Sequence, residues 1–239
     1  MNLADAPGGA RKLLKLRPSL LLTLVRHGQS EGNRQQLIQG QSDYPLSELG
    51  VRQAEALRHH LVERGVTFDA VYSSDLQRAR QTCDVVAGGL PVTEDQRLRE
   101  KNYGVCENQP VSELARAASA AGLPVAQFVP AGGESQQQVR ARAGAFFRDV
   151  CQHHLSDQCT RVLVTSHGCL IRELISHLFE TYHGNLKKAD ANRIAPNTGV
   201  SVVHVARAGS EPDSLTLHFL KMHSDEHLGN VASTAPPGV

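Results

Sequence analysis

Two histidines occupy the same kind of position at distant points of the chain. His27 and His167 each follow an apolar run that is typical of a buried strand, and a glycine follows each of them. In an open α/β sheet, ligands bind beyond the carboxyl ends of the strands, where a glycine lets the backbone turn sharply beside a ligand. One strand-end histidine is more often a structural hydrogen-bonding group than a catalytic one. Two in matching contexts predict that both imidazoles face one pocket, if their strands are neighbours.

Arginines stand where they could bind a phosphate beside these histidines. Arg26 directly precedes His27, and Arg78 lies in the first turn of an expected helix whose N-cap is Ser74 or Asp75. Free backbone N–H groups at a helix start favour an anion, and a guanidinium is a planar, bidentate donor to phosphate. Phosphoryl transfer depends mainly on positioning and electrostatic stabilisation, and a neutral imidazole can act as its nucleophile. These residues therefore predict phosphoryl transfer through a histidine.

A leaving alkoxide would need a proton, which a carboxyl group can supply. Glu100 is the candidate donor, in an irregular segment expected beside the pocket, and Glu107 is its competitor. The alternative is that these carboxylates form loop salt bridges with Arg97, Arg99 or Lys101.

The composition narrows the class of protein. The chain has 239 residues, with 25 Lys and Arg against 24 Asp and Glu, so its net charge of +1 offers no global attraction to nucleic acid. The longest apolar run is too short to span a membrane. The five cysteines form no CxxC pair, which favours reduced thiols and a cytoplasmic protein. The remaining histidines show no spacing typical of a metal site.

Strand and helix signals alternate along the chain, which indicates an α/β protein. Ser47 is a plausible N-cap of the first long helix, which Gly65 ends. The alternation predicts a mostly parallel central sheet with helices on both faces and a helical insertion, in one domain over residues 19–228. Residues 1–18 and 229–239 are expected to be flexible tails. Strands are expected at 20–25, 68–73, 91–95, 160–166, 200–205 and 215–222, and helices at 48–64, 76–87, 112–121, 136–150 and 169–182.

Three segments, in order along the chain, resemble the signature of the histidine phosphatase superfamily, whose fold is called phosphoglycerate mutase-like. They are LVRHGQSEGN, SSDLQRARQT and VTSHG, and the resemblance extends over most of the chain. It implies that His27 is the phosphohistidine nucleophile and that Glu100 is the proton donor. It also implies that neither a metal nor another cofactor takes part.

The same resemblance implies how a phosphoryl group would be held. Arg26, Arg78 and His167 would form the phosphate pocket, and Asn33 would make a further contact. The expected partner is therefore a small phosphorylated metabolite, and the sequence does not identify any protein partner.

Four further segments resemble one branch of the superfamily, the fructose-2,6-bisphosphatase-like regulators of glycolysis. They are LIQGQSDYPLSELG, RLREKNYGVCENQPVSELARAA, VPAGGES and APNTGVS. Gln39 and Gly40 are expected to line the substrate entrance, although a structural turn explains them nearly as well. Asn197 is expected to border the second histidine, whereas Ser135 or Glu134 is expected to serve the first amides of a helix. The branch implies hydrolysis of fructose-2,6-bisphosphate.

Two alternatives remain open. The first is a broad phosphatase or mutase that acts on 2,3-bisphosphoglycerate or phosphoglycerates. The second is a weakly active relative that serves as a binding protein or scaffold. The second is disfavoured because the full set of predicted catalytic groups is present in the chain, namely Arg26, His27, Arg78, Glu100 and His167.

Overall fold

The computed structural model describes residues 18–155, 159–182, 185–209, 214–229 and 231. The two expected tails fall almost entirely outside these ranges. At the centre lies a six-stranded sheet with the strand order β3-β2-β4-β1-β5-β6. Its strands are β1 (Ser19–Arg26), β2 (Ala70–Ser73), β3 (Thr93–Glu94), β4 (Thr160–Ser166), β5 (Val200–Arg207) and β6 (Leu215–Ser224).

The strands that carry the two histidines are direct neighbours. β1 and β4 pair in parallel, with Arg26 opposite Ser166, so His27 and His167 leave the sheet side by side at its carboxyl edge. β2 and β3 extend the parallel part of the sheet, whereas β5 and β6 are antiparallel. The predicted mostly parallel sheet is therefore confirmed, and the condition for a shared pocket is met.

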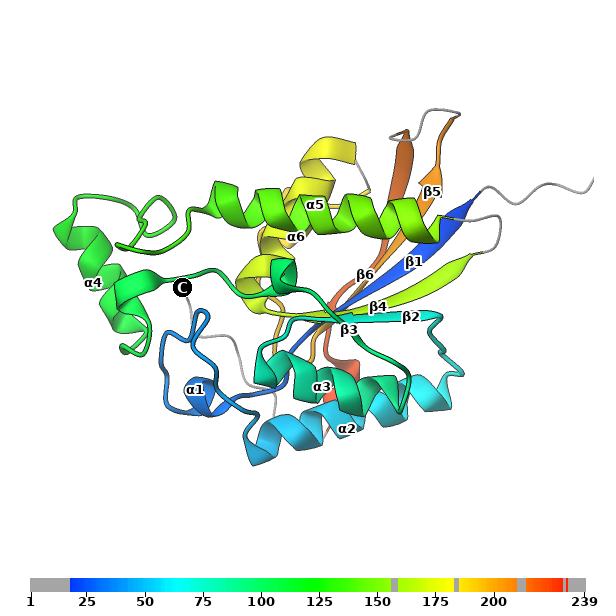
Figure 1. The fold of residues 1–239 in the computed structure, drawn as a ribbon, viewed down its shortest axis with the longest axis horizontal. Helices are drawn as coiled ribbons and strands as arrows, with labels where there is room; N and C mark the ends of the chain where they lie inside the picture. Colours follow the sequence, from blue (N-terminus) through cyan, green and yellow to red (C-terminus); the bar gives the residue numbers. More distant parts are fainter. Residues whose placement is uncertain (1–17, 156–158, 183–184, 210–213, 230, 232–239) are drawn as a thin grey trace, which may run out of the picture.

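Helices cover both faces of the sheet, as predicted (Figure 1). On one face α2 (Glu48–Glu63) and α3 (Gln77–Ala87) pack over a core that includes Leu57, Val86 and Leu163. On the other face α5 (Gln136–His154) and α6 (Gly168–Tyr182) pack over a larger core that includes Phe146 and Leu170. The short helices are α1 (Glu31–Arg34), α4 (Ser112–Ala120) and α7 (Lys188–Ala191), with 3-10 turns at Gln96–Leu98, Gly104–Cys106 and Glu226–Leu228. Within the described ranges, no helix is both long and apolar enough to cross a membrane.

The helical insertion covers the carboxyl edge of the sheet. α4 lies at one end of the molecule, beyond the ends of the parallel strands (Figure 1). It packs through Leu114 against Ile38 and Cys106 in a small separate apolar cluster. This cluster holds the loop after α1 over the strand ends, so it forms one wall of the space beside the histidines.

Several local expectations are confirmed and others are wrong. Ser47 does cap α2, and Ser135 caps α5 with a capping box. The N-cap of α3 is Leu76, not Ser74 or Asp75, because the Ser74 hydroxyl is used by His167 and by the Leu76 amide. The strand expected at 91–95 is reduced to two residues, and the irregular segment that follows Glu100 contains a 3-10 turn.

Candidate active site

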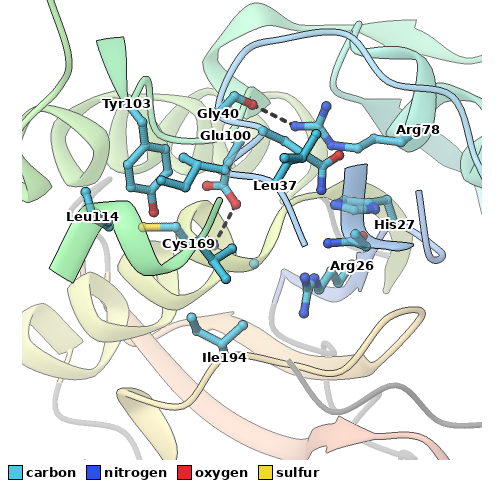
Figure 2. Close-up of a pocket in the computed structure, with 15 residues that line it drawn as sticks. Arg26, His27, Leu37, Gly40, Arg78, Glu100, Tyr103, Leu114, Cys169 and Ile194 are labelled. Atoms are coloured by element: carbon cyan, nitrogen blue, oxygen red, sulfur yellow. Dashed lines mark hydrogen bonds between the residues drawn. The ribbon is translucent and has the colours of Figure 1, made fainter. Parts of the chain in front are cut away.

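A cavity of about 90 Å³ opens at the carboxyl ends of β1 and β4 (Figure 2). Seven of the nine predicted site residues line it, and His167 and Asn197 lie outside its lining. The wall opposite the histidines is apolar and comes partly from α4 and the loop before it. The lining residues from the predicted set are Arg26, His27, Asn33, Gln39, Gly40, Arg78 and Glu100.

His27 is held in one orientation at the end of β1. Its backbone N–H donates to Ser166 O at 2.9 Å, and its Nδ1 lies 2.6 Å from Gly28 O. Because a carbonyl only accepts, Nδ1 carries the proton and the lone pair of the neutral ring is on Nε2. Burial first, and then the positive charges of Arg78 and Arg26, hold the pKa of His27 well below its usual range. The ring is therefore neutral at physiological pH, a state in which an imidazole nitrogen can act as a nucleophile.

Arg26 and Arg78 are anchored through their terminal nitrogens by backbone carbonyls. Arg26 Nη1 donates to Ala195 O at 2.8 Å. Arg78 donates from Nη1 to Ser42 O at 2.9 Å and from Nη2 to Gly40 O at 2.7 Å. Burial lowers the pKa of Arg78 to about 10, so its guanidinium remains charged at neutral pH. Both side chains are therefore fixed cations that line the cavity beside His27.

His167 lies behind His27 and is completely buried. The two ring centroids are 5.2 Å apart, and His167 Nε2 lies 2.9 Å from Ser74 Oγ. Burial, followed by the charge of Arg78, holds the pKa of His167 well below its usual range. If Ser74 donates to Nε2, the proton of this neutral ring is on Nδ1, where it can be donated to a ligand.

Three of these side chains carry buried donors without a partner. Among the described residues, four buried side-chain nitrogen or oxygen atoms make no hydrogen bond, and they are Arg26 Nε, Arg78 Nε, His167 Nδ1 and Thr165 Oγ1. A buried donor left unpaired costs roughly 1–3 kcal/mol, and more when it is charged. Arg26 and Arg78 line the cavity, so two of these unpaired donors belong to cationic side chains beside His27. This arrangement favours an anionic ligand.

Glu100 reaches the cavity from the loop after β3. Its Oε1 accepts the N–H groups of Lys101 at 2.8 Å and Leu170 at 3.2 Å, and its Oε2 accepts that of Cys169 at 3.0 Å. Figure 2 shows the carboxylate between Cys169 and the two arginines. Because Oε1 has two donors and Oε2 has one, Oε2 is the oxygen with room for a proton.

The alternative interpretation expected salt bridges between Glu100 and the neighbouring cations, but these cations have other partners. Arg97 pairs with Asp95 and Asp149, and Arg99 pairs with Asp75. Lys101 lies with its ammonium 5.2 Å from the centre of the Tyr103 ring.

Glu107, the competitor for the acid role, has a different environment. Its Oε1 accepts the N–H groups of Gln41 and Tyr103, and its Oε2 accepts the N–H and the hydroxyl of Ser42. It does not line the cavity. Glu107 therefore fastens the loop that carries Gly40 to the turn that follows Glu100.

Gln39, Asn33 and Asn197 belong to one polar network around His27. The hydroxyl of Ser30 donates to Gln39 Oε1 at 2.6 Å and also contacts Asn33 Oδ1, within the capping box of α1. Asn197 donates from Nδ2 to His27 O at 2.9 Å. Asn197 was expected to border the second histidine, and this hydrogen bond joins it to the backbone of the first histidine. Its side chain therefore helps to fix the backbone of His27.

Arg142 on α5 holds the segment that carries Glu100, and no sequence pattern predicted this contact. It donates from Nη1 to Arg97 O and Arg99 O, and from Nη2 to Glu100 O at 2.9 Å. It also forms a bidentate ion pair with Glu134, which in turn accepts the N–H of Asn102. Glu134 therefore does not serve the first amides of α5. No local pattern reveals this arrangement, because the contacts join segments far apart in the chain.

Comparisons with known proteins agree with this geometry. A family model described as "Histidine phosphatase superfamily (branch 1)" matches residues 22–217. The chain is 33% identical to the fructose-2,6-bisphosphatase TIGAR of Xenopus tropicalis, over 88% of this chain and 95% of the relative. It is 32% identical to the TIGAR of Mus musculus, over 90% and 98% of the two chains.

This chain is also similar to a solved structure of a phosphatase. The native structure of a mycobacterial glucosyl-3-phosphoglycerate phosphatase matches with a TM-score of 0.73 and 28% identity, over 86% of this chain and 99% of that one. The resemblance to the fructose-2,6-bisphosphatase-like branch, expected from segments outside the shared motifs, is confirmed by the curated relatives. With a family model that covers most of its length, this chain belongs to the histidine phosphatase superfamily, branch 1.

Proposed function

We propose that this chain hydrolyses phosphate monoesters through a phosphohistidine at His27, and that its substrate is fructose-2,6-bisphosphate. Membership of the family supports phosphatase activity. The observation that carries the mechanism is the trio of unpartnered buried nitrogens on Arg26, Arg78 and His167, whose side chains line the cavity with His27 or pack against its ring.

The reaction takes place in two displacements. In the first, His27 Nε2 attacks phosphorus, an N–P bond forms, and the P–O bond to the substrate breaks. Glu100, as the carboxylic acid, gives its proton from Oε2 to the leaving oxygen. Arg26, Arg78 and His167 donate to the phosphoryl oxygens throughout.

In the second displacement, water attacks phosphorus and the N–P bond breaks. The Glu100 carboxylate accepts the proton that water loses, and inorganic phosphate leaves. His27 returns to its neutral state, so the cycle balances with no metal, oxidant or further reactant.

The choice of fructose-2,6-bisphosphate is supported by the names of the relatives and by two residues that line the cavity. The curated relatives named above are fructose-2,6-bisphosphatases. Gln39 and Gly40, from the segment that resembles that branch, lie in the cavity lining. Removal of this ester would restrain glycolysis.

We also propose a cytoplasmic location, supported by the five free cysteine thiols.

A phosphoglycerate ester is the second candidate substrate. One observation favours it, because the structural relative is a glucosyl-3-phosphoglycerate phosphatase. The experiment is phosphate release, without divalent metal, from fructose-2,6-bisphosphate, 2,3-bisphosphoglycerate and 3-phosphoglycerate, with His27→Ala as the control. Preferential release from the fructose ester supports the proposal. Release mainly from the glycerate esters would mean that a phosphoglycerate is the substrate. No phosphate release from any of the three esters would favour the scaffold alternative.

A further inference from the structure

A second cavity lies on the face of the sheet that carries α2. It has a volume of about 310 Å³ and is bounded by α2, by strands β1, β5 and β6, and by the turn at Glu226–Leu228. It is more than three times the size of the cavity beside His27, and it has no lining residue in common with that cavity. Its volume falls at the lower end of the roughly 300–1,000 Å³ typical of small-molecule sites.

The lining combines an apolar floor with a cationic rim. Leu57, Leu61 and Phe68 belong to the floor, together with valines of β5. The rim carries Arg64 and Arg161, and neither arginine has a carboxylate partner among the ion pairs of the described residues. Among the residues that the structure describes, no Asp or Glu lines the cavity. An occupant that matches this charge has an apolar body and a single anionic group.

The rim also contains two histidines and a lysine. His60 and His227 have ring centroids 5.9 Å apart, and Lys221 pairs with Glu226 just outside the lining. Arg64 Nη1 lies 3.2 Å from His60 Nδ1. An anion seated among these groups would meet donors on several sides.

His227 connects this cavity to the catalytic segment. The Thr198 hydroxyl donates to Asn197 O at 2.7 Å, and the same oxygen lies 2.8 Å from His227 Nε2. Because the one hydroxyl proton is used, His227 must donate from Nε2 to Thr198 Oγ1. The Thr198 N–H in turn donates to Arg26 O at 3.0 Å, and lies 3.3 Å from His27 O.

Thr198 itself is held in an unfavourable backbone conformation. Its φ is +56°, which is a strained value for a β-branched residue. Such a conformation persists only when its surroundings hold it in place. The hydrogen bond from His227 is one of those contacts, so a change at His227 acts on the residue that holds the carbonyls of Arg26 and His27.

We propose that the cavity beneath α2 is a binding site for a small carboxylate with an apolar body, and that its occupancy lowers turnover through His227 and Thr198. A carboxylate on the rim competes with Thr198 for the His227 N–H. The loss of that contact loosens the segment that positions the backbone of His27.

The test uses octanoate on the full-length protein, with 8-anilinonaphthalene-1-sulfonate as the fluorescent probe and octylammonium as the charge-reversed control. We expect octanoate to displace the probe and octylammonium not to displace it. In the Arg64→Gln/Arg161→Gln variant, the octanoate Kd should rise at least about fivefold, because two charge-assisted contacts are removed. The matched variant Arg52→Gln/Arg148→Gln removes two exposed arginines outside the cavity and should leave Kd unchanged.

Turnover of p-nitrophenyl phosphate tests the connection. Saturating octanoate should lower kcat at least about twofold with KM unchanged, and the Arg64→Gln/Arg161→Gln variant should lose this response while its basal kcat is kept. Equal displacement by octylammonium, or an unchanged Kd in that variant, would overturn the site. A rise in KM alone would place octanoate in the phosphate pocket and overturn the proposal, and an unchanged kcat would overturn the connection. The fluorescence result does not depend on the proposed phosphatase activity, so a failure of the proposed binding site can be distinguished from a failure of the proposed function.

Discussion

The Oε2 oxygen of Glu100 accepts the backbone N–H of Cys169 at 3.0 Å. This contact joins the loop after β3 to the first turn of α6, which begins directly after His167. The proposed acid and the second histidine are therefore fixed relative to each other through one helix start. A carboxyl group in such a position can protonate an oxygen that leaves phosphorus while that phosphorus is bonded to His27.

Replacement of Glu100 should separate the two chemical steps. With an alkyl phosphate, Glu100→Gln should lower kcat/KM, which reports the first displacement, by roughly 10²–10⁴-fold, because an alkoxide leaves poorly without a proton. With p-nitrophenyl phosphate kcat/KM should be nearly unaffected, since its leaving group is stable as the anion. Steady-state kcat/KM values for a series of leaving groups provide the measurement. An equal loss of kcat/KM across the series would contradict the acid role.

Arg142 should act as a positioning residue for the same step. Arg142→Met removes the donors that hold the carbonyls of Arg97, Arg99 and Glu100, so the carboxylate loses its fixed distance from the leaving group. We expect kcat/KM to fall about tenfold or more for alkyl phosphates and much less for p-nitrophenyl phosphate. Arg148→Met removes an exposed arginine from the same helix and is the control. If Arg142→Met lowers stability and its effect on the rate is the same for all leaving groups, Arg142 has a structural role only.

The sequence predicted the groups at the strand ends better than the loops between them. His27, Arg26 and His167 could be placed because two buried strands end in them, and parallel neighbours bring their ends together. Arg142 could not be found in this way, because it acts through carbonyls more than forty residues away in the chain. The roles of Glu100 and Glu107 could not be separated either, since each depends on which loop amides surround its carboxylate.

The start of α3 gives a second example of this limit. Ser74 has the residue type of an N-cap, yet its hydroxyl contacts His167 Nε2 in the structure. Local propensity favours the cap, whereas the buried imidazole needs a polar partner, and the buried group determines the outcome. Sequence rules therefore fail here at a residue that serves the site.

Arg78 should not be replaceable by lysine. A lysine has all its donors on one nitrogen, which cannot occupy the positions of Nη1, Nη2 and Nε together, so Arg78→Lys should lower kcat/KM by at least about tenfold. Arg80→Lys makes the same change two residues along α3, where Arg80 forms surface ion pairs with Asp84 and Glu94. It should have little effect, and equal losses in the two variants would argue against a phosphate contact by Arg78.

Acid should destabilise the fold partly through the two site histidines. Both pKa values lie well below the ordinary 6.5, so the unfolded chain binds these protons below about pH 6.5 while the folded protein does not. The free energy of unfolding should then fall, as pH decreases from 6.5, by up to about 1.4 kcal/mol per pH unit for each ring.

Urea unfolding at a series of pH values measures this effect. The His27→Gln/His167→Gln variant should show a shallower loss of stability below pH 6.5 than the wild type. Other buried histidines such as His223 remain, so the slope should decrease without disappearing. Parallel slopes in the two proteins would mean that the site rings are not held neutral.

The central claim is that the phosphoryl group passes through His27. The direct measurement is mass spectrometry of the Glu100→Gln protein after brief mixing with p-nitrophenyl phosphate, because the variant should still form the phosphoenzyme but hydrolyse it slowly. The account predicts one added phosphoryl group on the peptide that contains His27, with about one equivalent of nitrophenol released in a burst. The absence of that modification, with turnover retained in His27→Ala, would contradict it.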